Sequence, residues 1–516
     1  MADLHLDIDR AAGGVAGQIT RELREAVRRG RLAAGARLPA SRELARDLGV
    51  SRGVVVEAYE QLTAEGFLVA KVGSGTRVAP AAARSAAVPV SGPGEGTRRP
   101  ASSGPPETSA PPGSSSAPPE VPGFPGSPGS ECGYGRRPTS PDLGTFPRQR
   151  WLAATRRVLA VLPSEALDYG DPGGVRELRE ELAAYLRRVR GADVTPDDLV
   201  IVGGVAQGLS LTVQVLAGRA AREDRGGDLG WFTGRAARPA SARGLRLAVE
   251  DPTGLRQLPL LRAAGAELVA VPADEEGIDV AALAASGARA VLLTPAHHYP
   301  TGVVLSPRRR AALIEWAAAA GAVVLEDDYD AELRFDRDPV GCLQGLAPGR
   351  VVLAGSVSKS LAPGLRLGWV AAPPHVAAAL RRARAELDMG SPVLEQHVLA
   401  ELMRTGAYDR HLRRMRREYR ARRDALVRAL AGHLPQIAVR GVSAGLHLLA
   451  ELPADWDERA AAAAARARGL TAEPVAPMRY RPGPPALVLG FARLPVHRAD
   501  EVVGALARDL AAGRPG

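Results

Sequence analysis

Residues 356–369 read SVSKSLAPGLRLGW, and the interpretation of the whole chain depends on one residue in this stretch, Lys359. Lysine and arginine together number 67, yet Lys71 and Lys359 are the only lysines in the sequence. Arginine stays protonated at any working pH, whereas a desolvated lysine can lose its proton and become a nucleophilic amine. The stretch therefore favours a lysine that forms a Schiff base. An ordinary surface lysine is the alternative that this stretch leaves open.

Apolar, strand-like runs alternate with alanine-rich helical segments from about residue 141 to residue 512. The runs are LVIVGG (199–204), LRLAVED (245–251), AVLLTP (290–295), AVVLEDDYD (322–330) and RVVLAGS (350–356). Strands that alternate with longer helices are typical of an α/β fold, in which helices cover both faces of a mostly parallel sheet. Residues 222–243 interrupt the pattern with glycine and charge, so we expect a surface insertion there.

Length and composition add three expectations. A chain of 516 residues should contain two or more domains. Residues 81–130 consist mainly of Pro, Gly, Ser and Ala, which cannot bury a core, so we expect a disordered linker over about 80–140. No apolar run is long enough to span a membrane, and Cys132 and Cys342 provide neither a disulfide framework nor a metal-site spacing. We therefore expect a cytoplasmic protein with no membrane partner and no metal.

The first 80 residues have the pattern of a helix-turn-helix. Apolar residues recur every four positions in QITRELREAVRRG (18–30), which predicts a helix. In LPASRELARDLGVSRGVVVEAYEQLTAEGFL (38–68), Ser41 is placed to cap a short helix and Ser51 a second one, with a turn at Gly49. The second helix of such a pair enters the DNA major groove. A three-helix module that binds protein has the same periodicity and is the alternative.

Two short strands are predicted in FLVAKVGSGTRVA (67–79), joined by glycines as in a wing. Cationic and small polar side chains stand at the helix starts and at the wing, where phosphate contacts concentrate. These candidate DNA-binding residues are Arg42, Ser51, Arg52 and Lys71. The net charge of +10 also favours a polyanionic partner.

These motifs resemble the winged helix-turn-helix of the GntR family over residues 10–79. The resemblance implies that Arg42, Ser51 and Arg52 hold backbone phosphates of double-stranded DNA, with contacts to base edges as the open alternative. It also implies that Gly73 and Gly75 let the wing approach the minor groove.

A pyridoxal phosphate bound at Lys359 would need a carboxylate at its pyridine nitrogen, which keeps the ring an electron sink. EDDYD (326–330) ends a buried strand, at the edge where parallel sheets bind ligands. Asp327 is the candidate carboxylate, and Tyr329 could donate a hydrogen bond to the cofactor's phenolic oxygen. A solvated acidic loop is the alternative for this motif.

The cofactor would also need a cup for its phosphate. VGGVAQGLSL (202–211) passes from a strand through a glycine pair into a helix, whose free N–H groups can bind an anion. The candidate contacts are Gly204, Ser356, Ser358 and Arg366. TPAHHYPTG (294–302) would place His297, His298 and Tyr299 beside the ring, although these histidines could equally be ordinary loop residues.

Residues 141–512 as a whole resemble the fold-type I aminotransferase-like domain, and behind a GntR-like head they resemble the MocR subfamily of transcriptional regulators. The resemblance implies the cofactor roles of Lys359, Asp327, Tyr329 and Arg366. It further implies that Tyr169, in YGDPGG (169–174), reaches the cofactor phosphate of a partner subunit. An effector carboxylate would be bound by Arg479 in PMRYRPG (477–483), with Arg256 as the weaker second candidate. Tyr299 replaces the asparagine that aminotransferases carry before the PTG turn.

Three functions are therefore open. The first is a homodimeric regulator that senses pyridoxal phosphate or its adduct with an amino compound. It would bind an operator with repeated half-sites and control pyridoxal phosphate synthesis or amine and amino-acid metabolism. The second is a working aminotransferase with an appended DNA-binding head. The third is a DNA-binding module on an inactive scaffold. We rank them in this order, with physiological turnover not expected.

Overall fold

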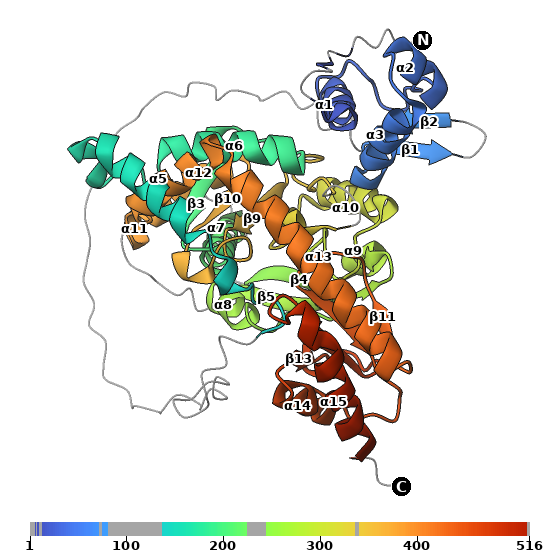
Figure 1. Ribbon diagram of the computed structural model, residues 1–516. Helices are drawn as coiled ribbons and strands as arrows, with labels where there is room; N and C mark the ends of the chain where they lie inside the picture. The colour runs from blue at the N-terminus through green and yellow to red at the C-terminus, as the bar shows by residue number, and fades with distance from the viewer. Residues whose placement is uncertain are drawn as a thin grey trace, which may run out of the picture.

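The computed structural model describes residue 6, residues 8–9, and the ranges 13–71, 75–80, 137–223, 244–335 and 340–512 (Figure 1). Most of the predicted linker, nearly all of the predicted insertion and Gly73 lie outside the described residues. Within the described ranges, no helix has the length and apolarity needed to cross a bilayer.

The head, residues 13–80, has the predicted order of helices and strands. It consists of α1 (Val15–Arg28), α2 (Ser41–Asp47), α3 (Arg52–Glu65), β1 (Leu68–Lys71) and β2 (Gly75–Val78). The two strands pair antiparallel, with Leu68 opposite Val78, and form the wing. Gly49 makes the turn between α2 and α3 with a φ of 59°. The predicted winged helix-turn-helix is therefore confirmed as a fold.

The capping of these helices differs from the prediction. Ser41 is the first helical residue rather than the cap, because Ala40 occupies the cap position and its N–H donates to the Glu43 carboxylate at 3.1 Å. Ser51 does precede α3, but its hydroxyl makes no capping hydrogen bond. The hydroxyl of Ser51 and the guanidinium groups of Arg42 and Arg52 belong to exposed residues. The start of α3 is thus accessible to a phosphate.

A large sheet forms the centre of the C-terminal region, residues 137–512. Within the described residues its strand order is β3-β10-β9-β8-β7-β4-β5-β6. The strands are β3 (Leu199–Val202), β4 (Leu245–Asp251), β5 (Ala266–Asp274), β6 (Gly277–Ile278), β7 (Ala290–Leu293), β8 (Val323–Asp328), β9 (Val351–Ser356) and β10 (Gly368–Ala371). The five predicted strands are all present, and the pairs β4·β5, β4·β7, β7·β8 and β8·β9 are parallel.

The sequence pattern missed strand β10, which pairs antiparallel with both β9 and β3. No α-helix connects β9 to β10, and a short connection without a crossover helix can only return the chain antiparallel. Because β10 is antiparallel to both of its neighbours, β3 and β9 still run in the same direction. The carboxyl ends of β3, β7, β8 and β9 therefore lie at one edge.

Helices cover both faces of the sheet, as predicted. Alternate residues of β3 belong to different cores: Leu199 and Ile201 pack with one set of helices, and Val200 and Val202 with another. The first set includes α5 (Arg148–Val161), α6 (Arg176–Arg190) and α12 (Val393–Arg404), and the second includes α7 (Val205–Glu223), α8 (Leu258–Ala263) and α11 (Pro374–Leu387). Helices α9 (Val280–Ala285) and α10 (Pro307–Ala320) share a third core with the head. The mostly parallel α/β fold is confirmed.

The long helix α13 (Ala407–His433) leads to a smaller C-terminal unit, red in Figure 1. Its strands pair antiparallel in the order β11-β12-β14-β13. They are β11 (Ala438–Arg440), β12 (His447–Glu451), β13 (Thr471–Pro474) and β14 (Ala486–Gly490), with helices α14 (Glu458–Ala467) and α15 (Ala499–Ala512). This second sheet was not predicted.

The head packs on the C-terminal region through α1 and the end of α3 (Figure 1). Arg24 and Glu65 form a buried ion pair, with the guanidinium donating to both carboxylate oxygens at 2.7–3.0 Å. Arg28 donates to the Gly345 carbonyl at 3.0 Å, and a Cβ on Gly341 would lie 2.7 Å from the Glu65 carboxyl carbon. The carboxyl end of α3 is therefore fixed, while its amino end, which starts at Arg52, stays exposed.

Removal of Glu65's charge should destabilise the head strongly. In Glu65→Gln the guanidinium of Arg24 stays buried without its counter-ion, a change that costs about 3–5 kcal/mol. Hydrogen exchange of the amides in α1 and α3 would measure the loss. Arg29→Ala is the matched control, because its ion pair with Glu25 is exposed and contributes about 0.5 kcal/mol or less. Equal protection in the two variants would contradict the assigned role of the buried pair.

Candidate cofactor site

The candidate residues gather at the carboxyl edge of the large sheet. Gly203 and Gly204 follow β3, residues 294–302 follow β7, Asp327 lies at the end of β8, and Lys359 follows β9. Ligands of open α/β sheets bind at this edge, because the loops that leave the parallel strands converge there. The topology thus brings together residues that are far apart in the sequence.

Lys359 is partly buried, and its surroundings disfavour its charge. Burial lowers the pKa of its amine to about 8, an effect that the charge of Asp330 opposes and that of Arg256 reinforces. The amine donates to the Thr139 hydroxyl at 3.3 Å. An amine in this state is available as a nucleophile near neutral pH, which a surface lysine is not.

Asp327 has one carboxylate oxygen without a partner. Oδ2 accepts a hydrogen bond from Gln257 Nε2 at 3.2 Å, whereas the buried Oδ1 has no partner among the described residues. Burial raises the pKa of this carboxyl to about 7, while the hydrogen bond from Gln257 opposes the change. A buried acceptor without a donor is costly, and a protonated pyridine nitrogen would satisfy it. This orphaned oxygen fits the ring of pyridoxal phosphate.

The two tyrosines lie beside these groups, but their hydroxyls already have partners. Tyr329 donates to the His297 carbonyl at 3.0 Å, and Tyr299 donates to the Glu473 carboxylate at 3.1 Å. Their rings meet edge to face with centroids 6.5 Å apart. The hydrogen bond from Tyr329 to a cofactor oxygen therefore stays a prediction.

The two histidines of this loop have different partners. Nδ1 of His298 lies 2.6 Å from the Thr301 hydroxyl in the loop, and its Nε2 lies 3.1 Å from the carbonyl of Pro252, which follows β4. His297 instead pairs with the carboxylate of Asp330.

The residues predicted to form the phosphate cup lie near the start of α7 and after β9. The Arg366 guanidinium donates to the Gly203 carbonyl. A Cβ on Gly204 would lie 2.8 Å from the same guanidinium. The Ser358 N–H donates to the Ser356 hydroxyl at 3.4 Å. Arg366 has a φ of 50°, in the left-handed region that non-glycine residues avoid. Such strain is typical of residues held for function rather than for stability.

The two arginines predicted to bind an effector carboxylate lie in different surroundings. Arg256 is close enough for its charge to act on Lys359, while Arg479 donates to the Pro484 carbonyl in its own loop. Arg256 is therefore the better placed of the two candidates for an effector carboxylate. Tyr169 is 80% exposed, as a residue that reaches a second subunit would be.

Sequence reasoning missed Thr139, Gln257 and His447. Thr139 belongs to the first described residues after the linker, and no motif marked it. Gln257 stands next to Arg256, so its position could have been found from the same stretch. His447 opens strand β12 in the sheet that was not predicted.

Comparison with known proteins agrees with this arrangement. Residues 15–78 match the family described as bacterial regulatory proteins, gntR family, and residues 239–506 match aminotransferase class I and II. The kynurenine aminotransferase of Pyrococcus horikoshii has a similar fold, with a TM-score of 0.63 and 25% identity over 73% of this chain and 90% of that one. Fold and site thus define a protein with a DNA-binding head and an aminotransferase-like domain.

Regulators with this combination match over nearly the whole chain. The pyridoxine biosynthesis regulator PdxR of Corynebacterium glutamicum is 34% identical over 85% of this chain and 84% of its own length. The regulator TauR of Rhodobacter capsulatus is 32% identical over 90% of both chains, and the probable rhizopine catabolism regulator MocR of Rhizobium meliloti is 28% identical. The chain belongs to the MocR subfamily of GntR-type transcriptional regulators.

Asp327 should make the stability of the cofactor-free protein depend on pH. The folded carboxyl keeps its proton up to a pKa of about 7, whereas the unfolded one releases it near 3.8. The folded state binds more protons in this window, so stability falls as pH rises through it. Asp327→Asn should remove this pH-dependent loss of stability. The difference in free energy of unfolding between the variant and the wild type should therefore shift in favour of the variant by up to about 4 kcal/mol between pH 4 and 8.

Urea unfolding of both proteins across this pH range measures the difference. The comparison with the variant matters because Glu326 and Glu332 also have pKa values raised to about 7 by burial. Parallel stability curves would show that Asp327 ionises normally in the folded protein.

Proposed function

We propose that this transcriptional regulator binds pyridoxal phosphate covalently at Lys359 and uses its occupancy to control DNA binding. The observation that carries the proposal is the pair of Lys359, with its lowered amine pKa, and Asp327, with its orphaned oxygen, at one sheet edge. When bound, the cofactor supplies an aldehyde that the amine can attack and a pyridine nitrogen for Asp327. Gly204, Ser356, Ser358 and Arg366 would hold its phosphate.

The signal is proposed to be pyridoxal phosphate itself, and the target its synthesis. In the C-terminal unit Tyr299 packs against an apolar cluster of Leu449, Val475, Met478, Ala486 and Val488, and its hydroxyl donates to the Glu473 carboxylate. A carboxylate at this position would repel the carboxylate of an amino acid. The relative from Corynebacterium glutamicum, which matches 85% of this chain, is named for pyridoxine biosynthesis.

Residual transamination is the second candidate activity, and Arg256 is the observation in its favour. Its charge acts on the Lys359 amine, so a substrate carboxylate could bind there. Steady-state release of a keto acid over many cycles, from an amino acid and 2-oxoglutarate, would support the enzyme.

Double-stranded DNA is proposed to bind at the exposed start of α3 and at the wing. Arg42, Ser51 and Arg52 are exposed and lie at the amino ends of α2 and α3, where the helix dipoles favour phosphate. Lys71 and Gly75 end and begin the two wing strands. A homodimer, with Tyr169 of each subunit at the partner's site, would read an operator with repeated half-sites.

Lys359→Ala should abolish covalent cofactor attachment. After reconstitution with pyridoxal phosphate and reduction with borohydride, mass spectrometry should find the label on the peptide with residue 359 in the wild type and nowhere in the variant. Lys71→Ala is a matched control, because it removes the only other lysine and should leave the label in place. A label that persists in Lys359→Ala would refute the assignment.

Arg52→Ala should weaken binding to every DNA sequence about equally. One lost phosphate contact lowers the slope of log K against log salt by about 0.9. Fluorescence anisotropy with a DNA duplex at several salt concentrations measures the slope. Arg29→Ala, which removes an exposed arginine at the end of α1, should leave it unchanged. An unchanged slope in Arg52→Ala would mean that this residue does not touch phosphate.

A further inference from the structure

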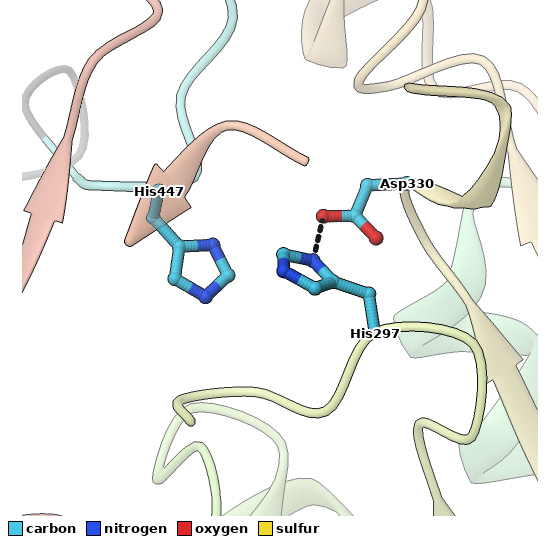
Figure 2. A group of neighbouring side chains, drawn as sticks. All are labelled: His297, Asp330 and His447. Atoms are coloured by element: carbon cyan, nitrogen blue, oxygen red, sulfur yellow. Dashed lines mark hydrogen bonds and ion pairs between the residues drawn. The ribbon is translucent and has the colours of Figure 1, made fainter. Parts of the chain in front are cut away.

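Two histidines and a carboxylate meet in the interior next to the cofactor site. His297 comes from the loop after β7, Asp330 follows β8, and His447 begins β12 in the smaller unit. Their exposed fractions are 3%, 2% and 1%. Figure 2 shows the ring of His297 between the other two side chains. The arrangement therefore joins the two sheets of the C-terminal region.

The distances suit a metal ion. One possible ligand atom from each residue lies within 4.8 Å of the others, and His297 Nδ1 lies 2.8 Å from Asp330 Oδ2. Nitrogen and oxygen ligands of tetrahedral zinc are about 3.3 Å apart, from bonds of about 2.0–2.1 Å. The separations in the cluster, 2.8 Å for this pair and no more than 4.8 Å for the others, allow this value after side-chain rotation.

His447 supplies an independent indication of a ligand. Both of its ring nitrogens are buried, and neither makes a hydrogen bond of normal geometry within the described residues, although the ring has a weak contact with the Pro300 carbonyl. The ring faces His297, with centroids 4.9 Å apart and an angle of 39° between the planes. Buried polar atoms almost always have a partner, and each exception in a folded protein requires an explanation. A cation between the two histidines would provide one.

The backbone holds the other two residues in place. Gly445 has a φ of 70°, and a Cβ there would lie 2.4 Å from Asp330 Oδ2 and 2.4 Å from His297 Cε1. The chain that leads into β12 thus lies directly against the His297–Asp330 pair, and only glycine fits. Ligands on three separate segments, fixed by packing, are preorganised in the way that metal sites require.

We propose that His297, Asp330 and His447 form a binding site for a divalent transition metal of the zinc class, with water at the remaining position. Imidazole nitrogens suit zinc, and two histidines with one carboxylate are an established ligand set for it. The ion would tie the loops of the large sheet to the smaller unit. No cofactor takes part in the site, so it does not rest on the proposed function.

Co²⁺ uptake by the full-length chain tests this inference. Protein stripped with a chelator and free of pyridoxal phosphate is titrated with Co²⁺, and bound metal is counted after gel filtration. One Co²⁺ per chain with visible ligand-field absorption is expected. His447→Gln should lower the affinity for Co²⁺ by at least about 100-fold. Even the loss of a residue that only hydrogen-bonds to a metal ligand typically lowers metal affinity by about 10–100-fold.

Matched variants make the outcome decisive. His411 is also buried with an unpartnered ring nitrogen but lies outside the cluster, so His411→Gln should bind Co²⁺ like the wild type. Lys359→Ala removes a positive charge that acts on His447, so it should bind Co²⁺ at least as tightly as the wild type. Asp330→Asn should weaken binding as well, and it replaces His447→Gln if that variant does not fold. No Co²⁺ uptake by the wild type, or equal uptake in His447→Gln and His411→Gln, would overturn the proposal.

Discussion

Burial of an amine and a carboxylate at one edge of the large sheet is the constraint on which the rest of this structure depends. Desolvation disfavours the ionised form of both groups, so the Lys359 pKa falls and the Asp327 pKa rises. Neither shift serves the stability of the empty protein. Both become useful when a ligand arrives that reacts with a neutral amine and brings its own positive charge to the carboxylate. The strained backbone at Arg366 belongs to the same pattern, because it too is a local cost at the edge where the ligand would bind.

Strand β8 connects this edge with the docked head. Successive side chains of a strand point to opposite faces, so Asp327 points away from its neighbours Glu326 and Asp328. Glu326 accepts hydrogen bonds from the N–H groups of Leu343 and Gln344, each at 3.1 Å. The next residue, Gly345, accepts from Arg28 of the head. The end of one strand is therefore linked by these contacts both to the cofactor edge and to the docked head.

The sequence was sufficient for much of this fold because the deciding signals are local. Helix periodicity and the turn at Gly49 predict the head, and apolar runs that end in glycine or acid place Gly204 and Asp327 correctly. The sequence did not predict strand β10 or the second sheet. The direction and pairing of a strand depend on the path of the connecting chain, and an apolar run of four or five residues carries no information about that path. The sequence also did not predict that His297, Asp330 and His447 lie together. The residues come from loops and strands of two different sheets, and only the packing of these sheets brings them into contact. Gln257 and Thr139 carry no motif, and only the fold shows that they touch the two central groups.

The position of Thr139 has a consequence for the segment that precedes it. The head is held at one end by its docking contacts, and the chain resumes at residue 137 beside the central amine. The described residues on the two sides of positions 81–136 are therefore both anchored on one body. The entropy of closing a loop grows only logarithmically with its length, and doubling the length costs about 0.6 kcal/mol. The docked arrangement should thus depend on its two anchors far more than on the number of residues between them.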